Sequence, residues 1–144
     1  MILCSNGFAA GTFEGSWENR KSGLFSVDLV QKGKMACGQV TEISGDKVDA
    51  SFVVGTVQGN LLIVAFTSGF NENGSRGKAE IRLTRSGISW HVTEPLKGSS
   101  WIADDMGAIR KPWEKGRQTI LADWCADQWG LIESGNISAV PLLP

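Results

Sequence analysis

The sequence has no tyrosine and a single histidine, His91, among its 144 residues. A Ser-His-Asp or Cys-His site needs an imidazole base and would have to use this residue. His91 alternates with the apolar Trp90 and Val92, so we expect it on the outer, solvated face of a strand. The sequence also lacks a Cys-x-x-Cys pair, which argues against zinc. We therefore predict no catalytic residue, no metal and no cofactor, and we favour a protein that is not an enzyme.

Long apolar runs and an excess of charge of one sign are missing as well. No apolar run approaches the about 20 residues that a membrane helix needs, so we expect no integral membrane segment. The chain has 14 Lys and Arg against 15 Asp and Glu, so no overall field favours nucleic acid. One basic cluster, with Trp113 inside it, runs from Arg110 to Arg117, but Glu114 and nearby aspartates dilute it. We interpret it as a solvated connector and expect no nucleic-acid partner.

Proline is scarce, at 4 residues, whereas glycine is abundant, at 18, and this balance fits hairpin turns better than disorder. Between Gly11 and about Pro95, short apolar segments alternate with turns that contain glycine. Residues 78–84 alternate most cleanly between polar and apolar side chains, and an eighth strand is expected near 102–110. The sequence therefore predicts an all-β fold, an antiparallel meander barrel of about eight strands.

Two segments depart from clean alternation. Residues 61–66 are apolar on both faces, which predicts a strand covered on both sides or one whose outer face meets the C-terminal segment. In the segment before it, Phe52 and Val54 share one parity and Val57 has the other. We therefore expect a bulge or corner at Gly55, which lies between them. We also expect aromatic residues to fill the interior: Phe25, Phe52, Phe66 and Trp90.

A different pattern begins after residue 111. Apolar residues from 117 to 129 fall at helical spacings and predict a short amphipathic helix that needs a partner for its apolar stripe. We expect the barrel domain to span 11–111, and a helical or irregular C-terminal appendage to span 112–144.

Tryptophan is in excess, with 6 residues, and most of them come late in the chain. Aromatic side chains are favoured at binding surfaces, although packing as a lid over the barrel is the alternative. The candidates for contact with a ligand or partner are Trp90, Trp101, Trp113, Trp124 and Trp129.

The cysteine count is odd, and it bears on the compartment. Residues 1–10 look like the end of a secretory signal, although a mature N-terminus with a chance resemblance is the alternative. If Cys4 leaves with the signal, Cys37 and Cys125 remain for a possible disulfide in an oxidising compartment. Such a bridge would close a loop of about 90 residues, worth about 4 kcal/mol on the chain-entropy model. Two buried free thiols are the alternative. We expect a secreted or periplasmic protein.

The turn motifs resemble those of a known class of barrel. The G-S-W of residues 15–17 matches the G-x-W with which lipocalins open, and glycine hairpins follow at 31–33 and 55–60. In these features residues 11–111 resemble the small calycin-like barrels, lipocalin-like and avidin-like, of bacterial secreted proteins. Biotin pockets of the avidin type use a tyrosine, which this sequence lacks, so the resemblance implies no biotin-binding residues.

These features together predict a non-enzymatic secreted or periplasmic binding protein. We favour a protein partner, in an inhibitor or immunity-type role, because about eight strands can fill their own interior. The alternative is a lipocalin-like carrier of a small apolar ligand in the barrel lumen. A barrel isomerase or cyclase that uses polar groups of the lumen is less favoured.

Overall fold

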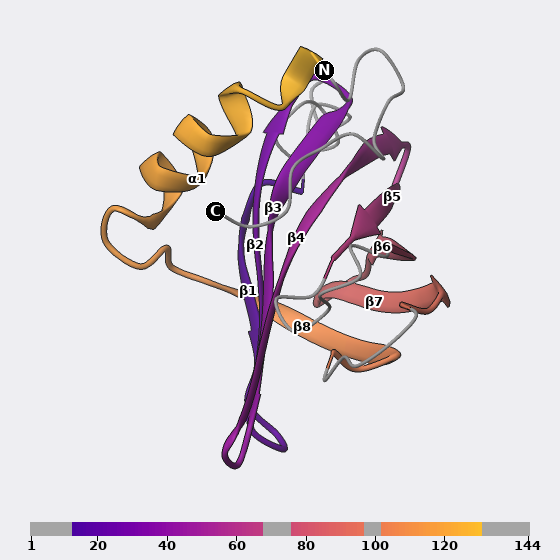
Figure 1. Ribbon diagram of the computed structural model, residues 1–144, viewed down its shortest axis with the longest axis vertical. Coiled ribbons are helices and arrows are strands. Elements are labelled where there is room, and N and C mark those ends of the chain that lie inside the picture. The colour runs from indigo at the N-terminus through magenta and orange to yellow at the C-terminus, as the bar shows by residue number, and fades with distance from the viewer. Residues whose placement is uncertain (1–12, 68–75, 97–101, 131–144) are drawn as a thin grey trace.

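The strands of the protein close into one barrel (Figure 1), in a computed structural model that describes residues 13–67, 76–96 and 102–130. Each strand pairs antiparallel with the next one in the sequence, and the last strand pairs with the first, which completes the ring. The prediction of an all-β meander barrel of about eight strands is confirmed. The strands are β1 (Gly15–Asn19), β2 (Leu24–Lys32), β3 (Met35–Ser44), β4 (Lys47–Gln58), β5 (Leu61–Phe66), β6 (Gly77–Leu83), β7 (Gly87–Glu94) and β8 (Asp105–Lys111).

The inner face of the wall carries one hydrophobic core. Side chains alternate between the two faces of a strand, so register decides which of them meet inside. Trp17 of β1 lies opposite Val27 of β2, which lies opposite Val40 of β3, and all three are buried. The other buried members of this core are Phe13, Phe25, Leu29, Ala36, Val53, Leu62, Val64, Phe66, Ala79, Ile81, Ile88, Trp90, Ile102 and Ala108.

Strand β4 alternates regularly through Gly55, so the expected bulge at this glycine is wrong. The pairing of β4 with β3 and with β5 runs through Gly55 without a shift of register. Val53 and Val57 both pack in the inner core, whereas Val54 belongs to a cluster outside the wall. Gly55 has a different role, because a Cβ atom there would overlap the carbonyl oxygen of Ile63 on β5. The glycine permits close approach of two strands.

A helix, α1 (Arg117–Ala126), covers part of the outside of the barrel (Figure 1). It packs on β2 and β3. The expectation that Phe52 helps to fill the interior is wrong, because its ring stacks on Trp124 of α1 with 3.9 Å between the centroids. Phe52 is apolar although it faces outward, because the helix covers it.

Strand β5 lies on the other side of the barrel from α1 in Figure 1. Its inward residues Leu62, Val64 and Phe66 are buried, and the alternate residues of this strand are half-buried. Helix α1 therefore does not cover the outer face of β5, although the apolar residues on both faces of this strand predicted such a cover. Residues 131–144 lie outside the described part. No helix within the described residues is long and apolar enough to cross a membrane.

Candidate functional site

Aromatic side chains occupy one end of the barrel interior. The Trp90 ring is buried and lies 5.3 Å from the Phe66 ring and 6.2 Å from the Phe25 ring, between centroids. Its indole Nε1–H donates a hydrogen bond of 2.8 Å to the carbonyl oxygen of Ala103, in the connection before β8. A buried indole is stable when this N–H has a partner. Trp90 is thus part of the packed core and ties the β7–β8 connection to it.

The other end is occupied by Phe13 and Trp17, which are both buried. The Arg110 guanidinium of β8 lies over the Trp17 ring, 4.1 Å from its centroid, and donates a hydrogen bond of 2.9 Å to the Glu14 carbonyl oxygen. Gly15 leaves room for this guanidinium, since a Cβ atom there would overlap Arg110. The cation–π contact therefore joins the last strand to the first, where the ring of strands closes.

Polar groups also point into the barrel, on β3 and β4. Glu42 lies opposite Asp49 in the register, and Ser51 is two residues further along the same face of β4. The Ser51 hydroxyl oxygen is buried without a hydrogen-bond partner among the described residues. The cavity beside Glu42 has a volume of about 10 Å³, which is room for roughly one water molecule. The space next to this carboxylate is too small for a substrate.

Burial raises the pKa of the Glu42 carboxyl above its usual value of 4.5. A hydrogen bond of 2.7 Å from the Ala103 N–H opposes this rise, and repulsion by Asp49 adds to it. The folded state therefore binds the Glu42 proton more tightly than the unfolded chain does. The stability that Glu42 contributes is fully present below pH 4.5 and is lost as the pH rises through the raised pKa.

The Glu42→Gln variant should therefore gain stability relative to wild type as the pH rises. Glutamine keeps an oxygen that can accept the Ala103 hydrogen bond, but it cannot ionise. We expect the difference in free energy of unfolding, variant minus wild type, to increase from about pH 4 to pH 7 in urea titrations. The exposed Glu114→Gln is the control. A difference for Glu42→Gln that stays constant over this range would contradict the raised pKa.

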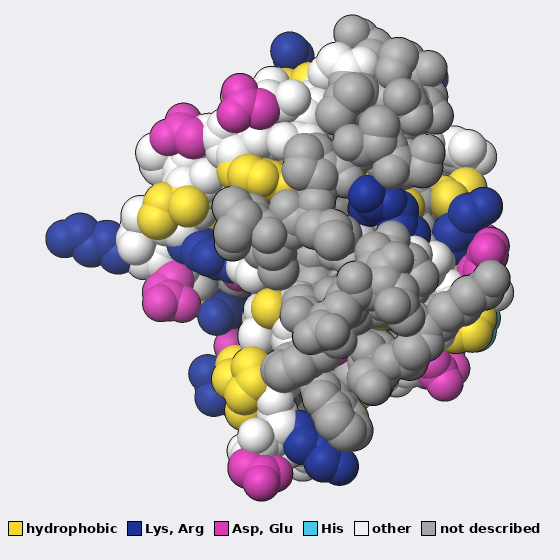
Figure 2. Space-filling view, in the orientation of Figure 1, with side chains coloured by type: hydrophobic (Ala, Val, Ile, Leu, Met, Phe, Trp, Pro, Cys, Tyr) yellow, Lys and Arg dark blue, Asp and Glu magenta, His cyan; other side chains and the backbone are white. Residues whose placement is uncertain are grey.

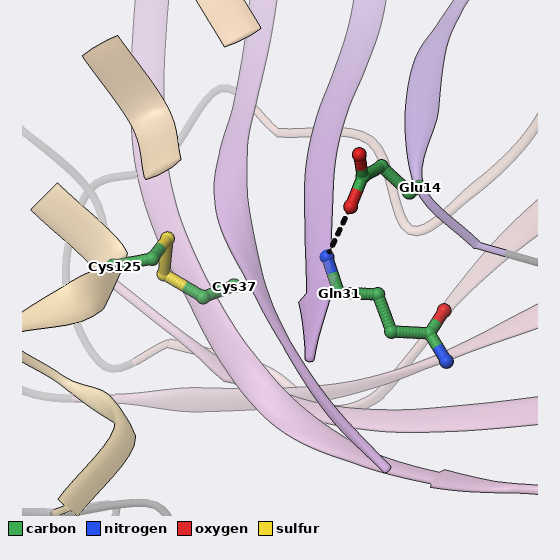
Figure 3. Close-up of a disulfide and its surroundings, with 4 residues drawn as sticks. All are labelled: Glu14, Gln31, Cys37 and Cys125. Atoms are coloured by element: carbon green, nitrogen blue, oxygen red, sulfur yellow. Dashed lines mark hydrogen bonds between the residues drawn. A yellow bond between two sulfur atoms is a disulfide. The ribbon is translucent and has the colours of Figure 1, made fainter. Parts of the chain in front are cut away.

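A disulfide holds α1 on the barrel. Cys37 of β3 and Cys125 of α1 are bonded across a sequence separation of 88 (Figure 3). Around it lies the outer cluster, which we define as the buried Val30, Cys37, Val54, Leu121 and Cys125 with the partly buried Met35, Trp113, Trp124 and Trp129 packed on them.

The helix has little local support of its own. Its N-cap is Gly116, which has φ of 79° and no capping side chain, and no acidic residue lies in the first turn and no basic residue in the last. Short helices without such features are marginal in water. The position and the stability of α1 therefore depend on the outer cluster and the disulfide.

Two carboxylates of the wall fix the first turn of α1. Asp28 accepts a hydrogen bond from the Ser16 hydroxyl and one of 3.3 Å from Arg117 Nε. Glu14 accepts one of 2.6 Å from Gln118 Nε2, and one of 2.9 Å from the backbone N–H of Gln31 (Figure 3). These polar contacts are part of the attachment of the helix.

A groove of about 690 Å³ lies outside the barrel over β1, β7 and β8. One side is formed by residues 18–21 at the end of β1, and the other by Thr84 and Ser86 between β6 and β7. Gly107 lies in the groove, and the nearest atom to a Cβ built there is the Ile88 carbonyl oxygen, 3.9 Å away. Ile109, which is 59% exposed, follows on the same outer face of β8. We call this hollow the β8 groove.

The predicted tryptophan candidates do not form one exposed surface. Trp90 is 1% exposed in the inner core, and Trp113, Trp124 and Trp129 pack in the outer cluster. Trp101 lies outside the described residues.

The lone histidine and the basic cluster also have defined places. His91 is exposed on β7, with Nδ1 beside Asp105 Oδ1. Arg110 stacks on Trp17, Lys111 pairs with Glu18, and Arg117 pairs with Asp28, so three cations of the basic cluster have local contacts. The face in Figure 2 shows positive and negative side chains interspersed. In the described part of the chain, no three His, Cys, Asp or Glu side chains are grouped to hold a metal ion.

The β8 groove was not predicted from the sequence. The sequence gives only a weak indication of the groove, namely a glycine and an isoleucine two residues apart in β8. The hollow itself depends on the turn residues that β1 and β6 place beside β8, which the sequence of β8 does not contain.

The fold and the groove define a small closed antiparallel barrel with a packed interior and a helix on its outside. This architecture is consistent with the calycin-like barrels that the G-x-W motif suggested. A scan against protein-family models gives no match, and no curated protein or solved structure matches the chain significantly.

Proposed function

We propose that this protein is a non-enzymatic binding protein that recognises a protein partner through the outside of its barrel. The observation that carries the proposal is the interior that the side chains of the described residues fill. Phe25, Phe66 and Trp90 occupy one end and Phe13 and Trp17 the other, while the cavity beside Glu42 measures only about 10 Å³. A carrier needs a lumen with room for its ligand. The packed core therefore favours an inhibitor or immunity-type role over a lipocalin-like carrier.

The β8 groove is the binding surface that we propose. Its volume of about 690 Å³ leaves room for side chains of a partner. Ile109 exposes 59% of its surface there, next to the charged Arg20 and Lys21. An apolar centre with a polar rim is the usual composition of a protein interface.

The disulfide supports a secreted or periplasmic location. Structural disulfides persist in oxidising compartments and are rare in the cytosol, where thiols are kept reduced. The Cys37–Cys125 bond is buried between wall and helix, as expected for a structural bond. A bacterial secreted barrel of calycin-like type is the class we propose for the chain.

Site-specific photo-crosslinking tests the proposed surface. A photoreactive amino acid is placed at Ile109 or, as a matched control, at Ile120, an isoleucine of α1 that is 63% exposed. Each protein is irradiated in the extracytoplasmic fraction of the organism that encodes it, and the partner is identified by mass spectrometry. We expect one partner to crosslink from position 109, to be absent from position 120, and to re-form a one-to-one complex when both proteins are purified.

The same preparation separates the two binding functions. Equal labelling from both positions, or none from position 109, would overturn the β8 groove as the binding surface. A lumen carrier would instead bind an environment-sensitive apolar dye and alter the fluorescence of the buried Trp90. We expect neither of these responses from the purified protein.

A further inference from the structure

We infer that the segment of the partner that enters the β8 groove is acidic and carries one apolar anchor residue. This inference rests on the proposed function, and it names the chemistry of the partner. It is drawn from the charges on one side of the groove and from the shape and polarity of its floor.

Cations outnumber carboxylates on the β1 side of the groove. Glu18 is contacted by two cations, with Arg20 Nε 2.7 Å from Oε2 and Lys111 Nζ 3.2 Å from Oε1. The hydrogen bond from Arg20 holds the pKa of Glu18 below its usual value, so Glu18 is charged at neutral pH. Arg20 and Lys21 line the groove, whereas Lys111 lies outside its lining. The two cations of the lining, Arg20 and Lys21, exceed its one carboxylate, Glu18, and this positive excess attracts a segment that brings carboxylates of its own.

The floor of the groove suits an apolar side chain. Gly107 presents backbone only, and its carbonyl oxygen already accepts a hydrogen bond of 2.7 Å from Asn19 Nδ2. Ile88 and Ala108 also border the groove, but their side chains belong to the inner core, so the exposed Ile109 supplies the apolar side chain of the lining. Because this floor carbonyl already has a partner, an apolar group seated there leaves it satisfied.

Strand β8 offers a partner segment only a short stretch of free edge. Strand β8 is already paired with β7 on one side and with β1 on the other. The pairing with β1 covers only 109–111, so 105–108 have no strand partner on that side, although the Gly107 carbonyl oxygen accepts a hydrogen bond from Asn19 Nδ2. This stretch is short for the strand-addition mode, which uses a row of backbone hydrogen bonds along a free sheet edge. We therefore expect recognition to depend mainly on side chains, that is, on the anchor residue at Gly107 and Ile109 and on carboxylates that meet Arg20 and Lys21.

Three synthetic peptides test this chemistry. Each has a fluorescent label and one central leucine, flanked on both sides by glutamate, serine or lysine, and binding is followed by fluorescence anisotropy. We expect the glutamate peptide to bind about tenfold more tightly than the serine peptide and the lysine peptide not to bind. The affinity of the glutamate peptide should fall between 50 and 300 mM salt because the groove charges are exposed.

Variants locate the binding in the groove. Lys21→Glu should weaken the glutamate peptide about tenfold and improve the lysine peptide, since it reverses one charge of the rim. Gly107→Leu should abolish binding of the glutamate and serine peptides by filling the floor, whereas Gly107→Ala, with its nearest neighbour at 3.9 Å, should retain it. Thermal melts show that each variant is folded.

The outcomes separate this inference from the proposed function. Equal affinity of the glutamate and serine peptides, or binding that survives Gly107→Leu, would overturn the acidic, anchored segment. If position 109 still crosslinks to a partner, the proposed surface stands and only the chemistry of the segment is wrong. If the crosslink is also absent, both are wrong.

Discussion

Replacing Cys37 and Cys125 together by alanine should lower the free energy of unfolding by about 4 kcal/mol. The bond closes a loop with a sequence separation of 88, and a loop of that length removes much conformational freedom from the unfolded chain. Alanine is the suitable substitute because both cysteines are fully buried and a serine hydroxyl would lack a partner. Urea unfolding of the two proteins under identical conditions gives the difference.

The same variant should loosen α1 before it opens the barrel. The helix has no capping side chain, so without the bond it is held by the Phe52–Trp124 stack, by the outer cluster and by the hydrogen bonds to Asp28 and Glu14. We expect faster tryptic cleavage at Arg117 and a red shift of tryptophan emission. Ile120→Ala, which removes an exposed side chain of the same helix, is the control. An unchanged urea midpoint in the double variant would show that the bond does not stabilise this fold.

Gly38→Ala should destabilise the protein by about 3 kcal/mol or more, and it is the single substitution from which we expect the largest loss. Gly38 lies inside β3, opposite Leu29 of β2. A Cβ atom there would overlap the carbonyl oxygen of Asp28, which belongs to the backbone and cannot swing away. The two strands would have to separate at this point.

Gly107→Ala is the matched control, because it makes the same change inside a strand of the same wall. There the nearest atom lies 3.9 Å from the new Cβ, so we expect a small effect or a gain. Thermal melts and soluble yield compare the two. If Gly38→Ala is insoluble while Gly107→Ala melts like wild type, the result supports close strand approach. Equal melting temperatures for all three proteins would contradict it.

The sequence predicted the barrel because turns and alternation are local properties. Residues 78–84 place apolar side chains on one face without help from any distant residue, and the glycine turns mark where each strand ends. Strand β4 shows the limit of this reasoning. Both of its faces are apolar near Phe52, and parity alone does not say which face is inside when a distant helix covers the outside.

The candidate site was harder to predict for a related reason. The late tryptophans were found as a group, and the helical spacing after residue 117 was found as well. Their burial, however, follows from α1 lying on β2 and β3, which is fixed by contacts between residues far apart in sequence, such as Phe52 with Trp124. The β8 groove lies between elements, and its lining residues come from separate segments of the chain, so no single segment predicts it.

The place of the disulfide also decides how the chain would respond to a mechanical pull on its two ends. Tension travels along covalent bonds, so it would pass from Cys37 directly to Cys125 and bypass everything between them. Strands β1 and β2 could be peeled from β8 and β3, but the chain of β4 to β8 would not be extended. The bond thus prevents the extension of roughly 300 Å of chain, the length of 88 fully extended residues. Most of the barrel would stay folded while the ends are pulled.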